Sequence, residues 1–228
     1  MKFLNYLFIA VIIVLLGGLG GVAAYRYASS HASGTPAIQM INKEDKYYIE
    51  ENTALVQIIE GVKNSIAGLE SSGKAIGSGL IMTSDGLVVT LAANIPSSSA
   101  PVISINGDNN VTYQVLKRDI KNNLALIKVD KSSLATKGFY DLSQLKIGTR
   151  VFVLSQIYSG SAFTLSVNEG IVKSFTDDII KTNIVDAGYV NGSPVFDISG
   201  NVLGLAYKEA GNSISIIPAS KIKAFAGI

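Results

Sequence analysis

The chain has 228 residues, of which 48% are hydrophobic and 16% charged, and its formal net charge is +2 at pH 7. This length allows one large domain or two small ones, with a sizeable core. The small net charge, spread over residues of both signs, gives no reason to expect a nucleic-acid partner. The absence of cysteine excludes disulfides and thiol catalysis, but it does not identify the compartment.

The N-terminal segment predicts a membrane anchor over residues 1–24. Residues 4–24 read "LNYLFIAVIIVLLGGLGGVAA" without a charge, and a helix of that length would be roughly 31 Å long, which matches a bilayer core. A removable signal peptide has a shorter apolar region, although "YASSHASG" offers small residues for cleavage. The short tail before the span favours an extracytoplasmic location for the rest of the chain, on the periplasmic or cell-surface side. Gly17 and Gly21 have the G-x-x-x-G spacing of a dimerising helix face.

Residues 25–52 are predicted to form a juxtamembrane linker, because the segment begins small and polar and then becomes highly charged. A helix is expected to begin at Thr53, a potential N-cap. Its apolar residues follow at helical spacing: Leu55, Ile58, Ile59 and Val62.

From about residue 65 the pattern changes to short runs rich in Val, Ile, Leu and Tyr, separated by turn signals such as Ser84-Asp85-Gly86. Such spacing is typical of an all-β barrel or sandwich. A break near residues 138–148 divides the strands into two halves. We therefore expect a first barrel over about 65–140, a second over about 146–217, and a short closing helix over 218–226.

Two segments resemble the trypsin-like serine proteases of the HtrA/Deg type, a resemblance that covers roughly residues 53–226. "GSGLIMTSDGLVVTLAAN", residues 77–94, resembles the family's histidine segment, with that position at Ala93, or at Asn94 if "AAN" is aligned with the trypsin "AAH". "RDIKNNLALIKVD", residues 118–130, resembles the aspartate segment, with Asn123 at the aspartate position. The resemblance implies a trypsin-like double β-barrel domain over residues 53–228.

A third segment, residues 182–205, resembles the nucleophile loop and the strand after it. "DAGYVNGSPVF" places Asn191 at the nucleophile position and Tyr189 at the glycine position whose N–H belongs to the oxyanion hole. All three triad positions are then replaced, and the resemblance implies a pseudoenzyme without cofactor or metal.

In the family, substrate lies beside the strand after this loop, which here contains the candidate peptide-groove residues Leu205, Ala206, Tyr207 and Lys208. The expected function is therefore a membrane-anchored peptide- or protein-binding module or scaffold. Two alternatives stay open. One is a serine endopeptidase with a non-standard arrangement, using Ser193 or Ser78 with Lys128 or Lys173. The other is a structural subunit of a membrane complex.

Overall fold

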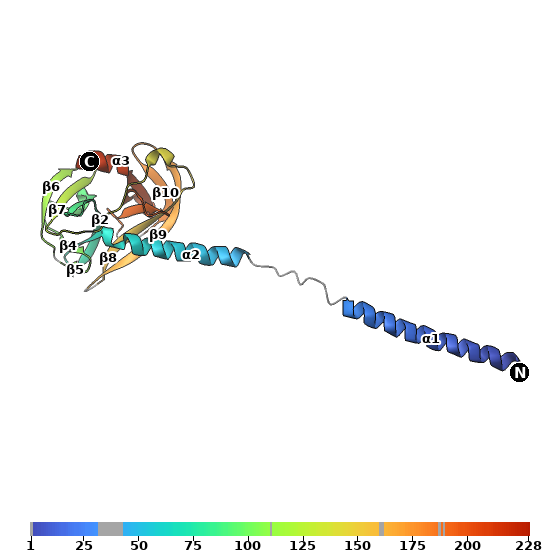
Figure 1. The fold of residues 1–228 in the computed structure, drawn as a ribbon. Coiled ribbons are helices and arrows are strands. Elements are labelled where there is room, and N and C mark those ends of the chain that lie inside the picture. Colours follow the sequence, from blue (N-terminus) through green and yellow to red (C-terminus); the bar gives the residue numbers. More distant parts are fainter. Residues whose placement is uncertain (1, 32–42, 110, 160–161, 187, 189) are drawn as a thin grey trace. The chain divides into compact units, whose positions relative to one another are not determined.

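The computed structural model describes residues 2–31, 43–109, 111–159, 162–186, 188 and 190–228 (Figure 1). The chain divides into two compact units, Met1–Tyr47 and Tyr48–Ile228. The first unit contains helix α1 (Lys2–His31), and the second contains all the described strands.

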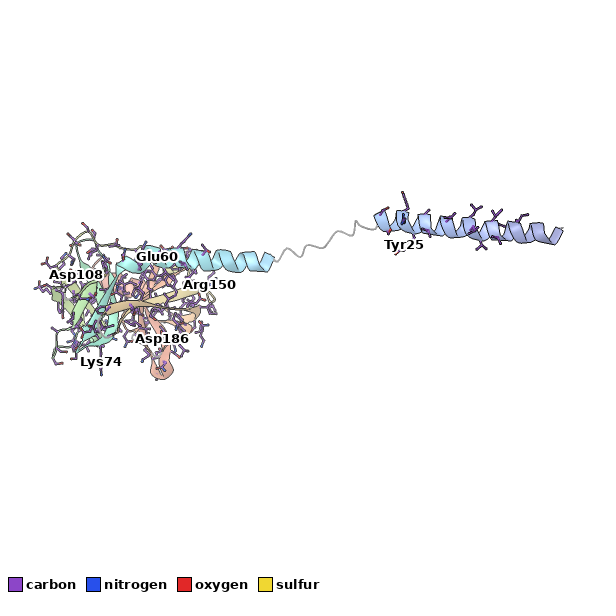
Figure 2. All side chains as sticks on the ribbon, turned by 90° about the horizontal axis from the view of Figure 1, so that it is seen from below. Tyr25, Glu60, Lys74, Asp108, Arg150 and Asp186 are labelled. Atoms are coloured by element: carbon purple, nitrogen blue, oxygen red, sulfur yellow. The ribbon has the colours of Figure 1, made fainter. Side chains whose placement is uncertain are left out.

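Helix α1 is apolar, and its described side chains are exposed. Within it, Val11–Ser30 has a mean hydropathy of 1.6 and is long and apolar enough to cross a membrane, a test that a signal sequence near the N-terminus also passes. The helix continues past Tyr25, labelled in Figure 2, so the beginning of the predicted linker is helical. A Cβ added at Gly17 or Gly21 would meet no atom within 4 Å, and dimerisation through this face stays a prediction.

Helix α2 runs from Lys43 to Val62. The predicted start at Thr53 is wrong, because the preceding "KEDKYYIEEN" is rich in Glu and Lys, which favour helix and extend it towards the N-terminus. Residues 32–42 of the predicted linker lie outside the described residues. Near its end, α2 packs three partly buried side chains on the core of the second unit: Leu55, Ile58 and Ile59.

The first sheet of the second unit is antiparallel, with the order β5-β4-β1-β2-β3-β7-β6. Its strands are β1 (Ile66–Ser71), β2 (Lys74–Ile81), β3 (Leu87–Leu91), β4 (Val102–Ile105), β5 (Asp108–Asn109), β6 (Tyr113–Asp119) and β7 (Leu124–Val129). The predicted first barrel is therefore not a closed ladder. β5 and β6 are the two edge strands of this order, and no pairing joins them among the described residues. Between them, Val111 N donates to Ile103 O on β4 at 2.8 Å.

The second group of strands forms a closed barrel in the order β10-β13-β12-β11-β8-β9, as the trypsin-like resemblance implies. Its strands are β8 (Arg150–Ser159), β9 (Ala162–Phe175), β10 (Ile180–Val185), β11 (Pro194–Asp197), β12 (Val202–Lys208) and β13 (Ser213–Pro218). Helix α3 (Ala219–Ala226) follows, and Lys117 on β6 reaches it by donating to Phe225 O at 2.9 Å.

A shared apolar core joins the sheet, the barrel and the two helices α2 and α3. Phe152 on β8 stacks on Phe196 on β11, with ring centroids 5.4 Å apart and an interplanar angle of 25°. Leu80 from β2 and Ile222 from α3 belong to the same cluster. Four short 3₁₀ helices lie among the described connections: η2 (Lys63–Ser65), η3 (Ala92–Asn94), η4 (Leu142–Gln144) and η5 (Ala210–Asn212). The shared core includes Leu91, directly before η3, and Phe196 on β11, so it anchors segments on either side of the candidate site.

Candidate functional site

The loop from β10 to β11 carries Asn191 and begins near Asp186, labelled in Figure 2. Asn191 is bonded on both its backbone and its side chain. Its carbonyl oxygen accepts from Ser78 N at 3.0 Å and from Asn94 Nδ2 at 2.9 Å. Its side-chain Oδ1 accepts from the backbone N–H of Lys208 at 2.9 Å. The side chain at the predicted nucleophile position is therefore engaged with the end of β12. Tyr189 lies outside the described residues.

Gly192, directly after Asn191, requires glycine for two reasons. Its φ of +79° lies in the left-handed region, which side chains with a Cβ seldom adopt. An added Cβ would also lie 2.6 Å from Thr90 Oγ1 and 2.8 Å from Asn94 Nδ2. The loop thus passes tightly over β3 and η3, which explains how Asn94 reaches its backbone.

The two candidate histidine positions have different environments on η3. Ala93 is exposed, and its backbone N–H donates to Asn123 Oδ1 at 3.1 Å. Asn94 is only 3% exposed, and its Nδ2 donates to Thr90 Oγ1 at 3.0 Å as well as to Asn191 O. A catalytic base must reach both the orienting group and the substrate. Ala93 lies beside Asn123 at an exposed position, whereas Asn94 is a buried link between β3 and the loop.

Asn123 precedes β7 and adopts φ 52°, a left-handed conformation that asparagine tolerates better than most residues. Its carbonyl oxygen accepts from Ala92 N at 3.1 Å, and its side chain accepts from Ala93 N. Arg118 Nη2 also donates to Ala92 O at 3.2 Å. The structure therefore places Asn123 beside Ala93 and Asn94 beside Asn191, so these predicted positions meet around η3.

The serines considered as substitute nucleophiles are buried. Ser193 is 0% exposed, and its Oγ is bonded to Ser155 Oγ at 2.8 Å. Ser78 is also buried, and its Oγ accepts from Gln156 N at 2.9 Å. These bonds join β2 and the loop to β8. Both hydroxyls have partners inside the protein and neither faces solvent.

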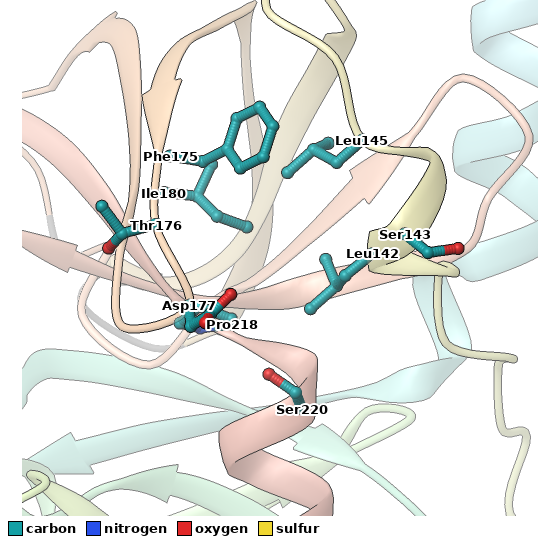
Figure 3. Close-up of a pocket in the computed structure, with 9 residues that line it drawn as sticks. All are labelled: Leu142, Ser143, Leu145, Phe175, Thr176, Asp177, Ile180, Pro218 and Ser220. Atoms are coloured by element: carbon teal, nitrogen blue, oxygen red, sulfur yellow. The ribbon is translucent and has the colours of Figure 1, made fainter.

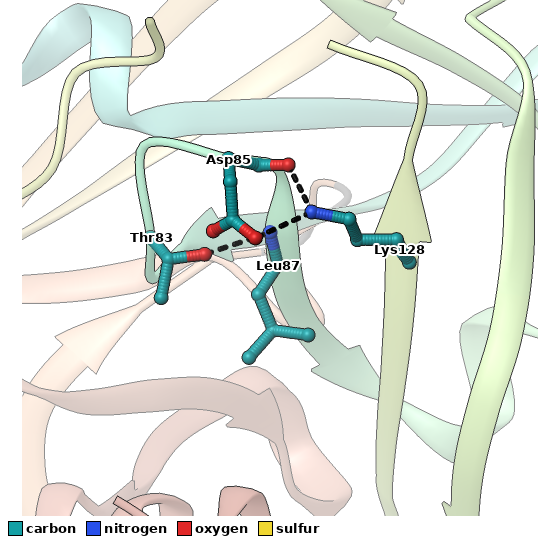
Figure 4. Close-up of polar contacts among 4 residues, drawn as sticks. All are labelled: Thr83, Asp85, Leu87 and Lys128. Atoms are coloured by element: carbon teal, nitrogen blue, oxygen red, sulfur yellow. Dashed lines mark hydrogen bonds and ion pairs between the residues drawn. The ribbon is translucent and has the colours of Figure 1, made fainter. Parts of the chain in front are cut away.

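Lys128, considered as a base for such a serine, is paired elsewhere (Figure 4). Its Nζ lies 2.6 Å from Asp85 Oδ2 in the turn before β3 and also donates to the Asp85 carbonyl. The hydrogen bond from Lys128, with a second from Thr83, lowers the pKa of Asp85 to about 2. Lys173, the other lysine considered, lies on β9 and is exposed.

The four residues proposed for the peptide groove lie on β12. Leu205 and Ala206 are buried. Ala206 N donates to Ser193 O and its carbonyl accepts from Gly192 N, each at 2.8 Å, so the loop occupies this part of the strand edge. Lys208 N is held by Asn191. Of the four, Tyr207 and Lys208 have side chains that are not fully buried.

Tyr207 lines a cavity of about 190 Å³ together with Asn123 and Lys121. Partial burial raises the pKa of the Tyr207 phenol, and the Glu209 carboxylate raises it further. This cavity was not predicted. Asn123 and Tyr207 are far apart in the sequence, and only the packing of the sheet on the barrel brings them together. The described residues contain no group of three His, Cys, Asp or Glu placed to hold a metal ion.

Comparisons with known proteins agree with this architecture. The family model "Trypsin-like peptidase domain" matches residues 77–205, more than half of the chain. Two similar curated proteins are described as "Probable periplasmic serine endoprotease DegP-like". The one from Halomonas elongata is 27% identical over 148 residues, which cover 60% of this chain and 30% of the relative. The one from Bartonella henselae is 27% identical over 166 residues, which cover 65% and 32%.

The chain therefore spans about a third of the length of these relatives. Among solved structures, the "HtrA-type protease AlgW with decapeptide" superimposes with a TM-score of 0.65 at 14% identity, covering 76% of this chain and 66% of that chain. This likeness shows a trypsin-like fold. The family match establishes that the chain belongs to the trypsin-like peptidase domain family, and its similar relatives are of the HtrA/DegP type.

Proposed function

We propose that this chain is a catalytically inactive trypsin-like homologue, anchored by α1, whose second unit binds peptides or proteins on the periplasmic or cell-surface side of a membrane. The observation that carries the proposal is the bonding of Asn191. Its side chain is an amide, without a nucleophilic oxygen, and it holds Lys208 N rather than facing a base.

The neighbouring positions support the same conclusion. Ala93 has no group that could take a proton. The Asn123 amide cannot stabilise an imidazolium as a carboxylate does, and in trypsin that one change lowers kcat about 10⁴-fold. In subtilisin, removal of the nucleophile alone lowers kcat about 10⁶-fold. The one histidine of the chain is His31, in the first unit.

Peptide binding at the end of β12 requires backbone groups and side-chain pockets but no nucleophile. The AlgW structure is named with a decapeptide, which makes a peptide a reasonable ligand class here. In this chain Lys208 N is already bonded to Asn191 Oδ1. A peptide that adds to this strand would compete with the Asn191 side chain, and the groove would be confined to Tyr207 and Lys208.

The activity test uses the full chain in lipid nanodiscs, with fluorophosphonate labelling and casein turnover, beside an active HtrA-type protease. We expect neither labelling nor turnover. The variant Ala93→His/Asn123→Asp/Asn191→Ser/Tyr189→Gly should acquire labelling, whereas the same variant built with Asn94→His should not. Wild-type turnover that disappears in Ser193→Ala would refute the proposal.

The binding test exploits Asn191. Asn191→Ala removes the acceptor and frees Lys208 N–H, whereas Asn191→Asp retains an acceptor and serves as the matched control. Since one hydrogen bond is worth about 0.5–1.5 kcal/mol, Asn191→Ala should bind an extended peptide about two- to tenfold more tightly than wild type. Equal affinities of the three proteins for every peptide in a random library would argue against a groove on β12.

A structural role in a membrane complex is a second candidate, favoured by one observation. Strand β9 exposes several apolar side chains on the outside of the barrel: Leu165 at 42%, Val167 at 40% and Ile171 at 39%. Such a stripe is typical of a contact surface. If this role is correct, crosslinking in native membranes will capture a partner in wild type but not in Leu165→Lys/Val167→Lys.

A further inference from the structure

A second cavity, of about 390 Å³, opens in the barrel away from the triad positions (Figure 3). It lies among η4, the end of β9, the turn into β10 and the junction of β13 with α3. None of its lining residues belongs to the candidate site described above. Any ligand bound here would therefore leave Asn191 and Lys208 untouched.

The floor of this cavity is apolar. Leu142, Leu145, Phe175 and Ile180 direct their side chains towards it in Figure 3. Leu145 and Ile180 are otherwise buried, whereas the Phe175 side chain remains 41% exposed. A dry apolar cavity of about 150 Å³ can hold benzene, and ligand sites in proteins are commonly about 300–1,000 Å³. The space is therefore large enough for an aromatic or branched aliphatic side chain with part of its backbone.

The rim of the cavity is polar and carries one charge. Ser143, Thr176 and Ser220 contribute hydroxyls, and Asp177 is the one charged residue that lines it. The neighbouring Asp178 is already paired, with its Oδ1 2.6 Å from Lys221 Nζ. Among the ion pairs of the described residues, Asp177 takes part in none. A cationic group on the ligand would complement this carboxylate.

We infer that this cavity binds a peptide through an aromatic or branched aliphatic side chain that is followed by lysine or arginine. The apolar side chain occupies the floor, and the cation meets Asp177 at the rim. The inference does not depend on the loss of catalysis, because it uses no residue of the triad positions. It gives the chain a binding site that is separate from β12.

The test is a methyl NMR titration of the full chain in lipid nanodiscs, with Leu and Ile methyl groups labelled. Three probes are compared: acetyl-Phe-Arg-amide, acetyl-Phe-Glu-amide and acetyl-Ala-Arg-amide. The first should shift the Leu142, Leu145 and Ile180 methyl signals saturably. The second should bind more weakly, and the third should leave those signals in place.

Four variants check the location and the charge. Ser220→Phe places a ring in the cavity and should abolish the shifts, whereas Ser199→Phe, at an exposed turn, should not. Asp177→Asn should lower the affinity for the Phe-Arg probe about two- to fivefold, the range for an exposed ion pair. Phe175→Ala, which removes a partly exposed wall of the cavity, should also weaken binding of the Phe-Arg probe. It provides the test of location if Ser220→Phe does not fold. Unsaturable shifts, equal binding of all three probes, or unchanged binding in the filled and Phe175→Ala variants would overturn the inference.

Discussion

The buried amide of Asn94 should be a substantial source of stability. Its Nδ2 donates to Thr90 Oγ1 at 3.0 Å and to Asn191 O at 2.9 Å. Two net hydrogen bonds correspond to about 1–3 kcal/mol. After Asn94→Ala, Asn191 O keeps its bond from Ser78 N, and Thr90 Oγ1 still donates to Ser78 O at 2.6 Å. Because neither partner is wholly orphaned, we expect a loss near the middle of that range, about 2 kcal/mol.

For a folded unit of this size, such a loss lowers Tm by about 4–8 °C. The measurement is thermal and urea unfolding of the full chain in nanodiscs, followed by tyrosine fluorescence and near-UV circular dichroism. Ala93→Asn is the matched control, since that position is exposed and surface changes usually stay within about 0.5 kcal/mol. A loss below about 0.5 kcal/mol in Asn94→Ala, or an equal loss in the control, would refute the assignment of Asn94 as a structural link.

Three further predictions concern the frame around the site, and unfolding measurements check each. Gly192→Ala should lower the free energy of unfolding by at least about 2 kcal/mol, through backbone strain and overlap of the new Cβ with its neighbours. The loss should exceed that of Gly211→Ala, which shares the φ of +79° but whose Cβ would meet no atom within 4 Å. Equal losses would contradict the overlap at Gly192. Phe152→Ala, at 1% exposure, should cost about 3–5 kcal/mol, and a smaller loss would mean that the core collapses around the gap. Since the folded-state pKa of Asp85 lies below its ordinary value of 3.8, at about 2, its contribution is present above pH 4 and lost as the pH falls to 2. The difference in free energy of unfolding between wild type and Asp85→Asn should therefore shrink as the pH falls from 4 to 2. A constant difference would exclude the Asp85 carboxylate as its source.

The sequence named definite candidate positions, which stay predictions, and it left the bounds of several regular elements open. The segments 77–94, 118–130 and 182–205 keep the spacing of a family pattern, so candidate positions within them could be named before any contact was known. The closed second barrel follows from the same pattern. In the described part of the first sheet, β5 and β6 remain edge strands and do not pair to close a barrel. Strand propensity contains no signal for such a departure.

The start of α2 was predictable from local propensity, because the Glu- and Lys-rich residues before Thr53 favour helix and continue it back to Lys43. Other features depend on tertiary packing and could not be predicted. The choice between Ala93 and Asn94 was open because a sequence does not show which of two adjacent residues is buried. The cavity beside Phe175 requires β9, η4 and α3 to meet, and these elements are far apart in the chain.

The residues at the predicted triad positions differ in what their change back to the family residues would do to the folded state. Asn123→Asp retains the oxygen that accepts from Ala93 N, so this hydrogen bond to η3 would survive. Ala93→His adds a side chain at an exposed position and displaces no buried group. Asn191→Ser is different, because the shorter side chain cannot reach Lys208 N as Asn191 Oδ1 does. Of the three replaced positions, only Asn191 has a side chain that bonds to β12, the strand expected to bind peptide. Asn191→Ser removes the hydrogen bond to Lys208 N and leaves that N–H free on β12. The same change should therefore restore a nucleophile and open the groove.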